Sequence, residues 1–270
     1  MSRITRHHSK HVDLRAFRHP CMFAFLMSNQ IISAMPFRLA STILVAAFAL
    51  VCWPILAQQN IAPSATNGPA VTQPDAALSP DEALEKLLAG NQRFVQDTPL
   101  RPDQSTTRRM QLYFSQHPFA CVLACSDSRV PPELIFDQGL GNIFVVRVLG
   151  NVLDKHALGS VEYAVETLHA PLVLVLGHSR CEVVSAAVSG QSVSGKITEI
   201  LDALKPAVRA ARDQRGDPIE QATKANIHLV VERLKASKPI LTEYIKTRKV
   251  KIVGGRYELL TGQVDILPQE

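Results

Sequence analysis

The sequence predicts an α/β protein in which helices flank a mainly parallel central β-sheet. Three short runs are apolar at nearly every position, as is typical of strands that are buried on both faces of a parallel sheet. Segments with the apolar spacing of helices alternate with these runs, and this is the order of elements in α/β folds. The predicted strands are FACVLA (119–124), NIFVVRV (142–148) and PLVLVLG (171–177).

An extended N-terminal helix is predicted before the first strand. Ser79 can cap its first turn, Pro80 suits that turn, and Glu82 completes a capping box. We expect this helix to run to about Ala89 and to end at Gly90. Further helices are predicted at residues 160–168, 182–190, 197–212 and 218–237. Strands on either side of a Thr261-Gly262 turn are predicted within residues 249–267.

Composition divides the chain into three parts. Residues 1–57 are expected to be an N-terminal extension plus a signal peptide, because a short basic start at Met35 leads into an uncharged apolar run (39–57). Translation is expected to start at Met35. Residues 58–78 carry Pro, Gly, Ser, Thr and Asn without periodicity and are predicted to be a linker. Residues 79–270 are predicted to form the folded domain.

The apolar run predicts where the protein is found. Cleavage around Ala57 would release a periplasmic or otherwise exported protein that is free of the membrane. The alternative is an uncleaved anchor, since a run of this length can just span a bilayer. Both alternatives place the folded domain outside the cytoplasm.

The net charge of +5 comes from the N-terminal extension. Residues 1–57 hold six of the 29 Lys and Arg residues and one of the 24 acidic residues, so the rest of the chain carries 23 of each. This remainder, residues 58–270, is formally neutral. It therefore has no electrostatic support for binding nucleic acid or an acidic membrane surface.

The cysteines favour a metal site over a disulfide framework. Of five cysteines, Cys121, Cys125 and Cys181 lie in the predicted domain, which is an odd number and too few for such a framework. Free thiols in an oxidising compartment are best explained if a metal holds some of them. Cys121 lies inside a predicted strand and is expected to be a core residue. A thiol oxidoreductase is not expected, because there is no C-x-x-C motif.

The chemically distinctive residues follow two of the predicted strands. Cys125 comes directly after the first strand, and His178 and Cys181 come directly after the third. The carboxyl ends of strands are where open α/β sheets build their sites. Two thiolates and one imidazole form a good zinc-binding set, and Asp127 is a candidate fourth ligand. Thiolate-rich ligation favours zinc over other metals.

Several stretches of this sequence resemble the β-class carbonic anhydrases, in the order and at the spacing of that family. They are CSDSRVPPELIFDQGLGNIFVVRVLGNV (125–152), GSVEYAV (159–165), GHSRC (177–181) and KIVGGRYELLTGQVDIL (251–267). The stretch GNQRF (90–94) is also similar. The resemblance covers about residues 80–268. It implies a zinc enzyme that interconverts CO₂ and bicarbonate, with one Zn²⁺ per chain.

The resemblance also implies roles for individual residues. Cys125, His178 and Cys181 would bind zinc, and Asp127 and Arg129 would be the catalytic pair. Asp127 would bind zinc in a closed state, or pair with Arg129 and leave the fourth position to water. Zinc in an open site acidifies its water, so that a hydroxide nucleophile exists near neutral pH. Arg129 would fix Asp127, and Asp127 would orient the hydroxide.

Two thiolate ligands offset the charge of Zn²⁺, so the bound water should be less acidic than at an all-histidine site. We therefore expect activity to rise with pH through the mildly alkaline range.

The plant-like branch of the family implies a shared substrate pocket. Gln116, Phe144 and Tyr163 match residues that reach this pocket from a neighbouring subunit. A homodimer or a dimer of dimers is therefore expected. In the predicted strand 142–148, Arg147 is buried by pattern, and we expect it to form a structural ion pair, for which a subunit interface is one possible place.

Glu182 departs from the family pattern, which has glycine after the second zinc cysteine. Its side chain adds bulk and negative charge beside a pocket for an anion, although glutamate also suits the first turn of a helix. We expect activity to be retained, either at a reduced rate or in full. A non-catalytic zinc-binding protein of the same fold is one alternative, and a hydrolase of a related small molecule such as carbonyl sulfide or carbon disulfide is another.

Overall fold

The computed structural model describes residues 78–268, all within one compact unit of the chain. The predicted extension and signal peptide (1–57), with the start at Met35 and the cleavage site at Ala57, lie outside the described residues, as does the linker up to residue 77. Between residues 78 and 268, no helix combines the length and apolar character that a membrane crossing requires.

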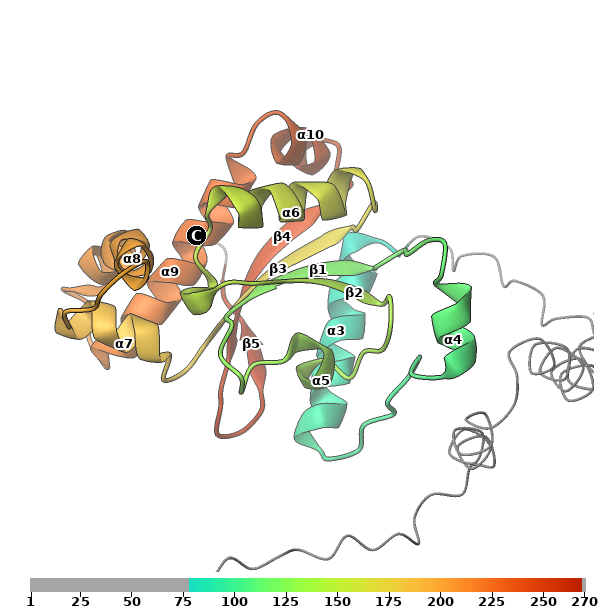
Figure 1. Ribbon diagram of the computed structural model, residues 1–270, viewed down its shortest axis with the longest axis horizontal. Coiled ribbons are helices and arrows are strands. Elements are labelled where there is room, and N and C mark those ends of the chain that lie inside the picture. The colour runs from blue at the N-terminus through green and yellow to red at the C-terminus, as the bar shows by residue number, and fades with distance from the viewer. Residues whose placement is uncertain (1–77, 269–270) are drawn as a thin grey trace, which may run out of the picture. The chain divides into compact units, whose positions relative to one another are not determined.

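The described residues form a five-stranded sheet with the order β2-β1-β3-β4-β5 (Figure 1). The four strands β2, β1, β3 and β4 are parallel, and β5 pairs antiparallel to β4. This confirms the predicted α/β fold with a mainly parallel sheet. The strands are β1 (Ala120–Ala124), β2 (Ile143–Arg147), β3 (Leu172–His178), β4 (Lys251–Tyr257) and β5 (Val264–Ile266).

The strand register brings the predicted site residues to one edge of the sheet. Ala124, the last residue of β1, pairs with Leu176 of β3. Cys125 therefore leaves the sheet at the level of Gly177, one residue before His178. Both strands are buried along their whole length, as their apolar sequences predict.

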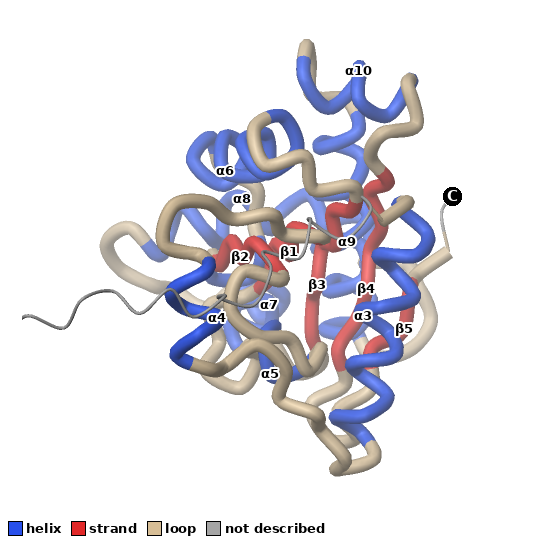
Figure 2. The backbone as a smooth tube through the Cα atoms, turned by 90° about the vertical axis from the view of Figure 1, so that its right-hand side faces the viewer, coloured by secondary structure: helices blue, strands red, loops and turns tan. Residues whose placement is uncertain are grey.

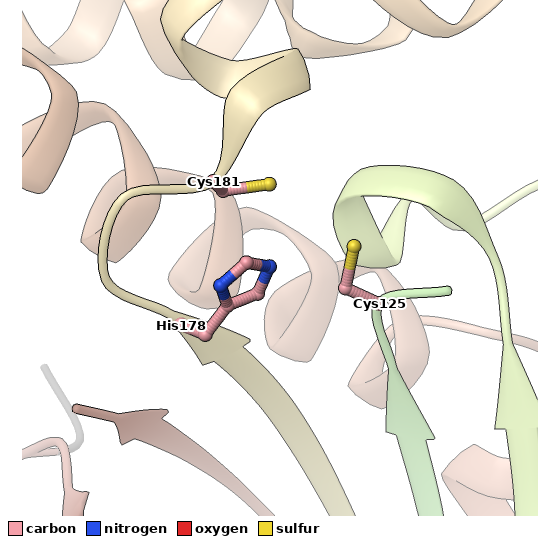
Figure 3. Close-up of side chains that lie close together, drawn as sticks. All are labelled: Cys125, His178 and Cys181. Carbon is pink, nitrogen blue, oxygen red and sulfur yellow. The ribbon is translucent and has the colours of Figure 1, made fainter. Parts of the chain in front are cut away.

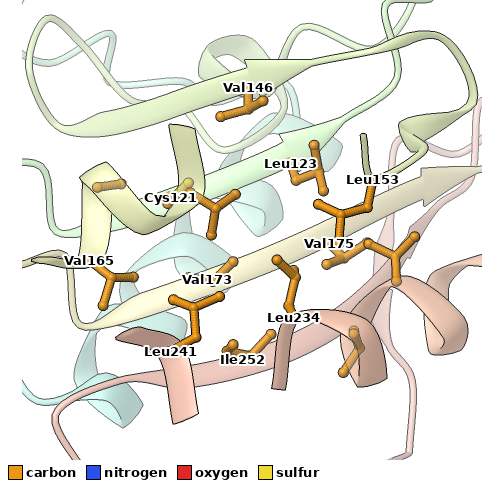
Figure 4. Packing of buried hydrophobic residues seen from close by; sticks show 14 of the residues in the cluster. Cys121, Leu123, Val146, Leu153, Val165, Val173, Val175, Leu234, Leu241 and Ile252 are labelled. Atoms are coloured by element: carbon orange, nitrogen blue, oxygen red, sulfur yellow. The ribbon is translucent and has the colours of Figure 1, made fainter. Parts of the chain in front are cut away.

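Helices cover both faces of the sheet (Figure 2). On one face, alternate residues of the central strands pack against α6 (Lys155–Glu166), α9 (Pro218–Lys235) and α10 (Ile240–Lys246) (Figure 4). On the other face, the remaining strand residues pack against α3 (Pro80–Val95) and α5 (Pro132–Ile135). Cys121 lies fully buried in the first of these clusters, which confirms its predicted core position. Burial raises the pKa of its thiol to about 12.

The remaining elements lie at the carboxyl end of the sheet or in connections. A third apolar cluster joins α7 (Glu182–Ser189), α8 (Ile197–Ala211) and α9 beside Cys125 and Cys181. Gly190 ends α7 with a left-handed φ of 68°, as predicted. The short helices α4 (Thr106–Gln111), α5 and α10 and the 3₁₀ turn η3 (Leu149–Asn151) were not predicted.

The prediction that the N-terminal helix ends at Gly90 is wrong. The capping box of Ser79 and Glu82 is present, but α3 continues through Gly90 to Val95. A Cβ atom at Gly90 would lie 1.8 Å from the carbonyl oxygen of Phe136. Glycine at this position permits close packing of α3 against the segment after α5, and it does not terminate the helix.

Candidate metal centre

Cys125, His178 and Cys181 converge at the carboxyl ends of β1 and β3 (Figure 3). Cys125 follows β1, His178 is the last residue of β3, and Cys181 is the N-cap of α7. All three side chains are buried, and their ligand atoms lie within 4.8 Å of one another. Tetrahedral zinc with these ligands needs atoms about 3.5 to 3.8 Å apart, so the residues can close around an ion with small side-chain movements.

The imidazole of His178 is oriented for metal binding. Its Nδ1 lies 2.9 Å from the carbonyl oxygen of Ser179, which fixes Nδ1 as the donor in the neutral ring. The other nitrogen, Nε2, is buried and has no hydrogen-bond partner among the described residues. Buried polar atoms are rarely left unpaired, so this nitrogen fits a metal ligand.

The Cys125 sulfur accepts hydrogen bonds from backbone N–H groups. The donors are Gly150, with N···Sγ 3.2 Å, and Asp127, with N···Sγ 3.4 Å. A hydrogen bond from the Cys181 thiol, together with His178 and these two N–H groups, lowers the pKa of Cys125 to about 4 despite its burial. The same hydrogen bond and burial raise the pKa of Cys181. Both cysteines bind a metal as thiolates, so a bound cation would displace any thiol proton that the pair retains.

The donor set of two sulfurs and one imidazole nitrogen is that of zinc in an open catalytic site. The three predicted metal ligands are therefore brought together, and the residues present fit Zn²⁺. Asp127 is not part of this cluster, although its Oδ2 lies only 3.9 Å from His178 Nε2.

Asp127 is instead paired with Arg129. The Arg129 Nε donates to Oδ1 at 2.9 Å, and a terminal guanidinium nitrogen donates to Oδ2 at 2.7 Å. The Arg129 backbone N–H also donates to Oδ1, at 2.9 Å. The Arg129 side chain lowers the pKa of Asp127 to about 2, so this carboxyl is ionised at neutral pH.

The prediction that Arg147 is buried is wrong for the single chain, and an ion pair at a subunit interface stays a prediction. Its side chain is exposed in this chain, and it donates to the carbonyl oxygens of Cys125 (3.0 Å) and Asp127 (2.5 Å). A strand pattern cannot identify this role, because the partners of Arg147 are carbonyl groups in the turn after β1. Arg147 thus fixes the backbone turn that carries Cys125 and Asp127.

A cavity of about 410 Å³ opens beside the metal ligands. Glu182, the first residue of α7, lies at this cavity and is exposed. The cavity is lined by Cys125, Ser126, Asp127, Ser128, Arg129, Leu149, Cys181, Glu182 and Val183.

The predicted pocket residues Gln116, Phe144 and Tyr163 do not line the cavity of their own chain. The rings of Phe144 and Tyr163 lie 6.2 Å apart, and Gln116 is exposed. Their role at a neighbouring subunit's pocket stays a prediction.

Gly150 was not predicted as part of the site. It adopts a φ of +68°, which L-residues rarely adopt, and a Cβ there would lie 2.9 Å from Val183. The sequence signal was a glycine at a strand end, but its contact with Cys125 depends on the tertiary structure.

Comparisons with known proteins agree with this geometry. The family model described as carbonic anhydrase matches residues 120–264. Carbonic anhydrase 2 of Mycobacterium tuberculosis is 38% identical over 68% of this chain and 91% of its own length. The carbonic anhydrase of Mycolicibacterium smegmatis is 37% identical over 70% and 93%.

Solved structures give the same assignment. The β-carbonic anhydrase CcaA superposes with a TM-score of 0.55 at 26% identity, over 68% of this chain and 95% of that chain. The β-carbonic anhydrase of Coccomyxa superposes with a TM-score of 0.53 at 25% identity, over 68% and 86%. With its parallel sheet and its Cys-His-Cys cluster, this chain belongs to the β-class carbonic anhydrases.

Proposed function

We propose that this protein hydrates CO₂ reversibly to bicarbonate and a proton, with Asp127 and Arg129 as the residues that orient the nucleophile. The observation that carries the proposal is the bidentate Asp127–Arg129 pair beside the buried Cys125, His178 and Cys181 cluster. Zinc in this cluster supplies an activated water molecule. The side chains of the cavity must then orient this nucleophile and admit CO₂.

Asp127 lies where its carboxylate can accept a hydrogen bond from the O–H of a nucleophile bound at the metal. Its Oδ2 lies 3.9 Å from His178 Nε2, a metal-ligand atom. The guanidinium and the backbone N–H of Arg129 donate hydrogen bonds to the carboxylate oxygens of Asp127. The Asp127 side chain therefore cannot rotate freely. A fixed acceptor of this kind orients the nucleophile toward CO₂, and orientation accounts for much of the rate in such reactions.

Glu182 supports a second candidate function, that of a non-catalytic zinc-binding protein. Its carboxylate shares the cavity with Arg129, the cationic group that would attract bicarbonate. A closed or repelling pocket would keep the metal site and lose turnover. We favour catalysis, because the exposed Glu182 leaves room for the side chain to turn toward solvent.

The variant Asp127→Asn tests the proposed function. It keeps the size of the side chain and removes the charge that Arg129 holds. Stopped-flow CO₂ hydration should fall by about 100-fold, with zinc content unchanged. Unchanged turnover in this variant would show that Asp127 does not take part.

We also propose that the protein works as a homodimer or a dimer of dimers. Large apolar side chains are exposed around α4, among them Met110 (71%), Tyr113 (78%) and Phe114 (92%), and Gln116 follows them closely. Exposed apolar side chains gathered in this way are typical of surfaces that contact another subunit. The related enzymes of Sordaria macrospora are described as tetrameric. Sedimentation should give a dimer or tetramer, and a monomer at micromolar concentration would contradict the proposal.

Export is proposed from the uncharged apolar run 39–57 alone. Cell fractionation and N-terminal sequencing should find the mature protein outside the cytoplasm, beginning near residue 58. A cytoplasmic protein that retains residues 35–57 would contradict this proposal.

A further inference from the structure

We propose that Ser179, Glu258, Arg256 and Glu220 form a positioning network that fixes the metal-binding imidazole of His178. None of these four residues is a metal ligand. The inference uses the metal site but does not depend on CO₂ hydration.

Ser179 is held by hydrogen bonds at three of its atoms. Its backbone N–H donates to the carbonyl oxygen of Tyr257 at 2.9 Å. Its hydroxyl donates to Oε1 of Glu258 at 2.8 Å and accepts from the Leu259 N–H at 3.0 Å. Its carbonyl oxygen, the third polar atom, lies 2.9 Å from His178 Nδ1. Since Ser179 is 5% exposed, these contacts leave it little freedom to shift.

Glu258 is held in turn by Arg256. A terminal guanidinium nitrogen of Arg256 donates to Oε2 of Glu258 at 2.5 Å, and the Leu260 N–H donates to Oε1 at 3.2 Å. The hydroxyl of Ser179 and the guanidinium of Arg256 lower the pKa of Glu258, so it accepts as a carboxylate. Both carboxylate oxygens are therefore occupied, and the one that meets Ser179 cannot rotate away.

Glu220 completes the network from a different part of the fold. It lies in the first turn of α9 and forms an ion pair with Nε of Arg256, which is on β4. The side chains of Arg256 and Glu220 are only 15% and 20% exposed. Such pairs are stronger than exposed ones, because solvent screens them less. The network thus ties the turn between β3 and α7 to both β4 and α9.

These residues line a second cavity, of about 1000 Å³, and not the one that holds Asp127 and Arg129. Ser179, Glu220, Arg256 and Glu258 all border this second cavity, whereas the metal ligands do not. Effects of changing them must therefore reach the metal through His178 and its turn.

The consequence follows from how metal-bound histidines are oriented. The group that accepts the second ring N–H sets the tautomer and the ring orientation, and losing such a partner costs about 10- to 100-fold in metal affinity. Here the acceptor is a backbone carbonyl, which no substitution removes. Substitutions in the network let the Ser179 carbonyl move but do not remove it. We therefore expect a loss of metal affinity of about 10-fold, the lower end of that range.

The test compares zinc release from full-length, zinc-loaded variants. Ser179→Ala and Glu258→Gln should transfer zinc to a chromogenic chelator about 10-fold faster than the wild-type protein. Their Co²⁺-substituted forms should show shifted or broadened visible absorption bands, because the ligand geometry becomes less uniform. Ser179→Thr keeps the hydroxyl and should restore the wild-type rate and spectrum.

Two matched controls and a milder variant separate positioning from general destabilisation. Ser160→Ala and Glu232→Gln each remove one contact far from the metal turn and should leave both readouts unchanged. Glu220→Gln changes the network residue that is farthest from His178, so it should speed zinc release only about two- to threefold. This milder variant still tests the proposal if Ser179→Ala does not fold.

The proposal is overturned if folded Glu258→Gln and Glu220→Gln release zinc at the wild-type rate with the wild-type cobalt spectrum, whatever their melting temperatures. Equal acceleration in the control variants would overturn it as well. Because neither readout needs CO₂, a protein without turnover gives the same decisive answer.

Discussion

Arg129 holds both carboxylate oxygens of Asp127, at 2.9 Å and 2.7 Å, although the two residues are separated by a single serine. The planar guanidinium makes two parallel hydrogen bonds, which a lysine ammonium cannot reproduce. The pair is half exposed on the arginine side and largely covered on the aspartate side, with side-chain exposures of 46% and 13%. The pair therefore serves mainly to orient Asp127, because an exposed ion pair adds little stability.

The first prediction concerns this geometry. Arg129→Lys keeps the charge and removes the bidentate contact, so kcat should fall about 30- to 100-fold while zinc content stays unchanged. Stopped-flow kinetics and metal analysis on the same sample measure both. Arg209→Lys on the exposed side of α8 is the control. Wild-type kcat in Arg129→Lys would show that the bidentate contact is unnecessary.

The second prediction concerns the metal ligands. Cys181→Ser replaces a soft sulfur by a weakly acidic hydroxyl, so zinc content after dialysis should fall from about one per chain to below about 0.1. Cys121→Ala removes the thiol that lies in the core cluster and should leave zinc content at the wild-type level. Retention of zinc by Cys181→Ser would contradict the assigned ligand set.

The third prediction concerns Glu182. If its charge repels anions beside Arg129, Glu182→Gln and Glu182→Gly should both raise kcat/KM for bicarbonate dehydration, by a factor of about five. If its bulk obstructs the cavity, only Glu182→Gly should do so. Turnover that rises in neither variant would show that this side chain points away from the pocket.

The fourth prediction concerns stability and Asp137, a buried residue after α5. Its carboxylate accepts from Arg93 Nε at 2.6 Å and from the N–H groups of Leu100 and Arg101, both at 2.9 Å. Burial alone would raise the pKa of Asp137, but these donors outweigh it and lower the pKa. Asp137→Asn should destabilise the protein by about 2 kcal/mol near pH 7. Asparagine tolerates the positive φ of 46° at this position, so the variant changes mainly the charge.

The pH dependence of this difference follows from the sign of the shift. A carboxyl whose folded-state pKa is depressed contributes stability above its unfolded pKa of about 3.9 and loses that contribution as the pH falls through the folded value. Urea unfolding of the two proteins should therefore give midpoints that converge below about pH 4. A constant difference down to about pH 2 would contradict the role of the charge.

The sequence predicted the central strands and the metal ligands because each depends on local pattern. Continuous apolar runs identify β1 and β3, and a residue that follows a parallel strand must lie at the carboxyl edge of the sheet. Cys125 and His178 were therefore predictable as neighbours. The end of α7 at Gly190 was predictable for the same reason, since a helix C-cap is a local conformation.

The features that the sequence did not predict depend on contacts between segments that are distant in the chain. Gly90 has the local signature of a helix end, but its role is set by Phe136, which lies far along the chain. Arg147 looked buried because its neighbours in β2 are apolar, yet its partners are two carbonyl groups of another turn. The network from Glu220 to Ser179 joins α9, β4 and the turn after β3, and no periodicity links these residues.

CO₂ hydration by the purified wild-type protein, followed by stopped flow from about pH 6 to about pH 9 with zinc measured on the same sample, tests the central claim most directly. The account predicts about one zinc per chain and turnover that rises with pH, since two thiolate ligands reduce the positive charge at the site. Full zinc occupancy without turnover across this range would contradict it and leave a zinc-binding protein whose pocket does not support catalysis.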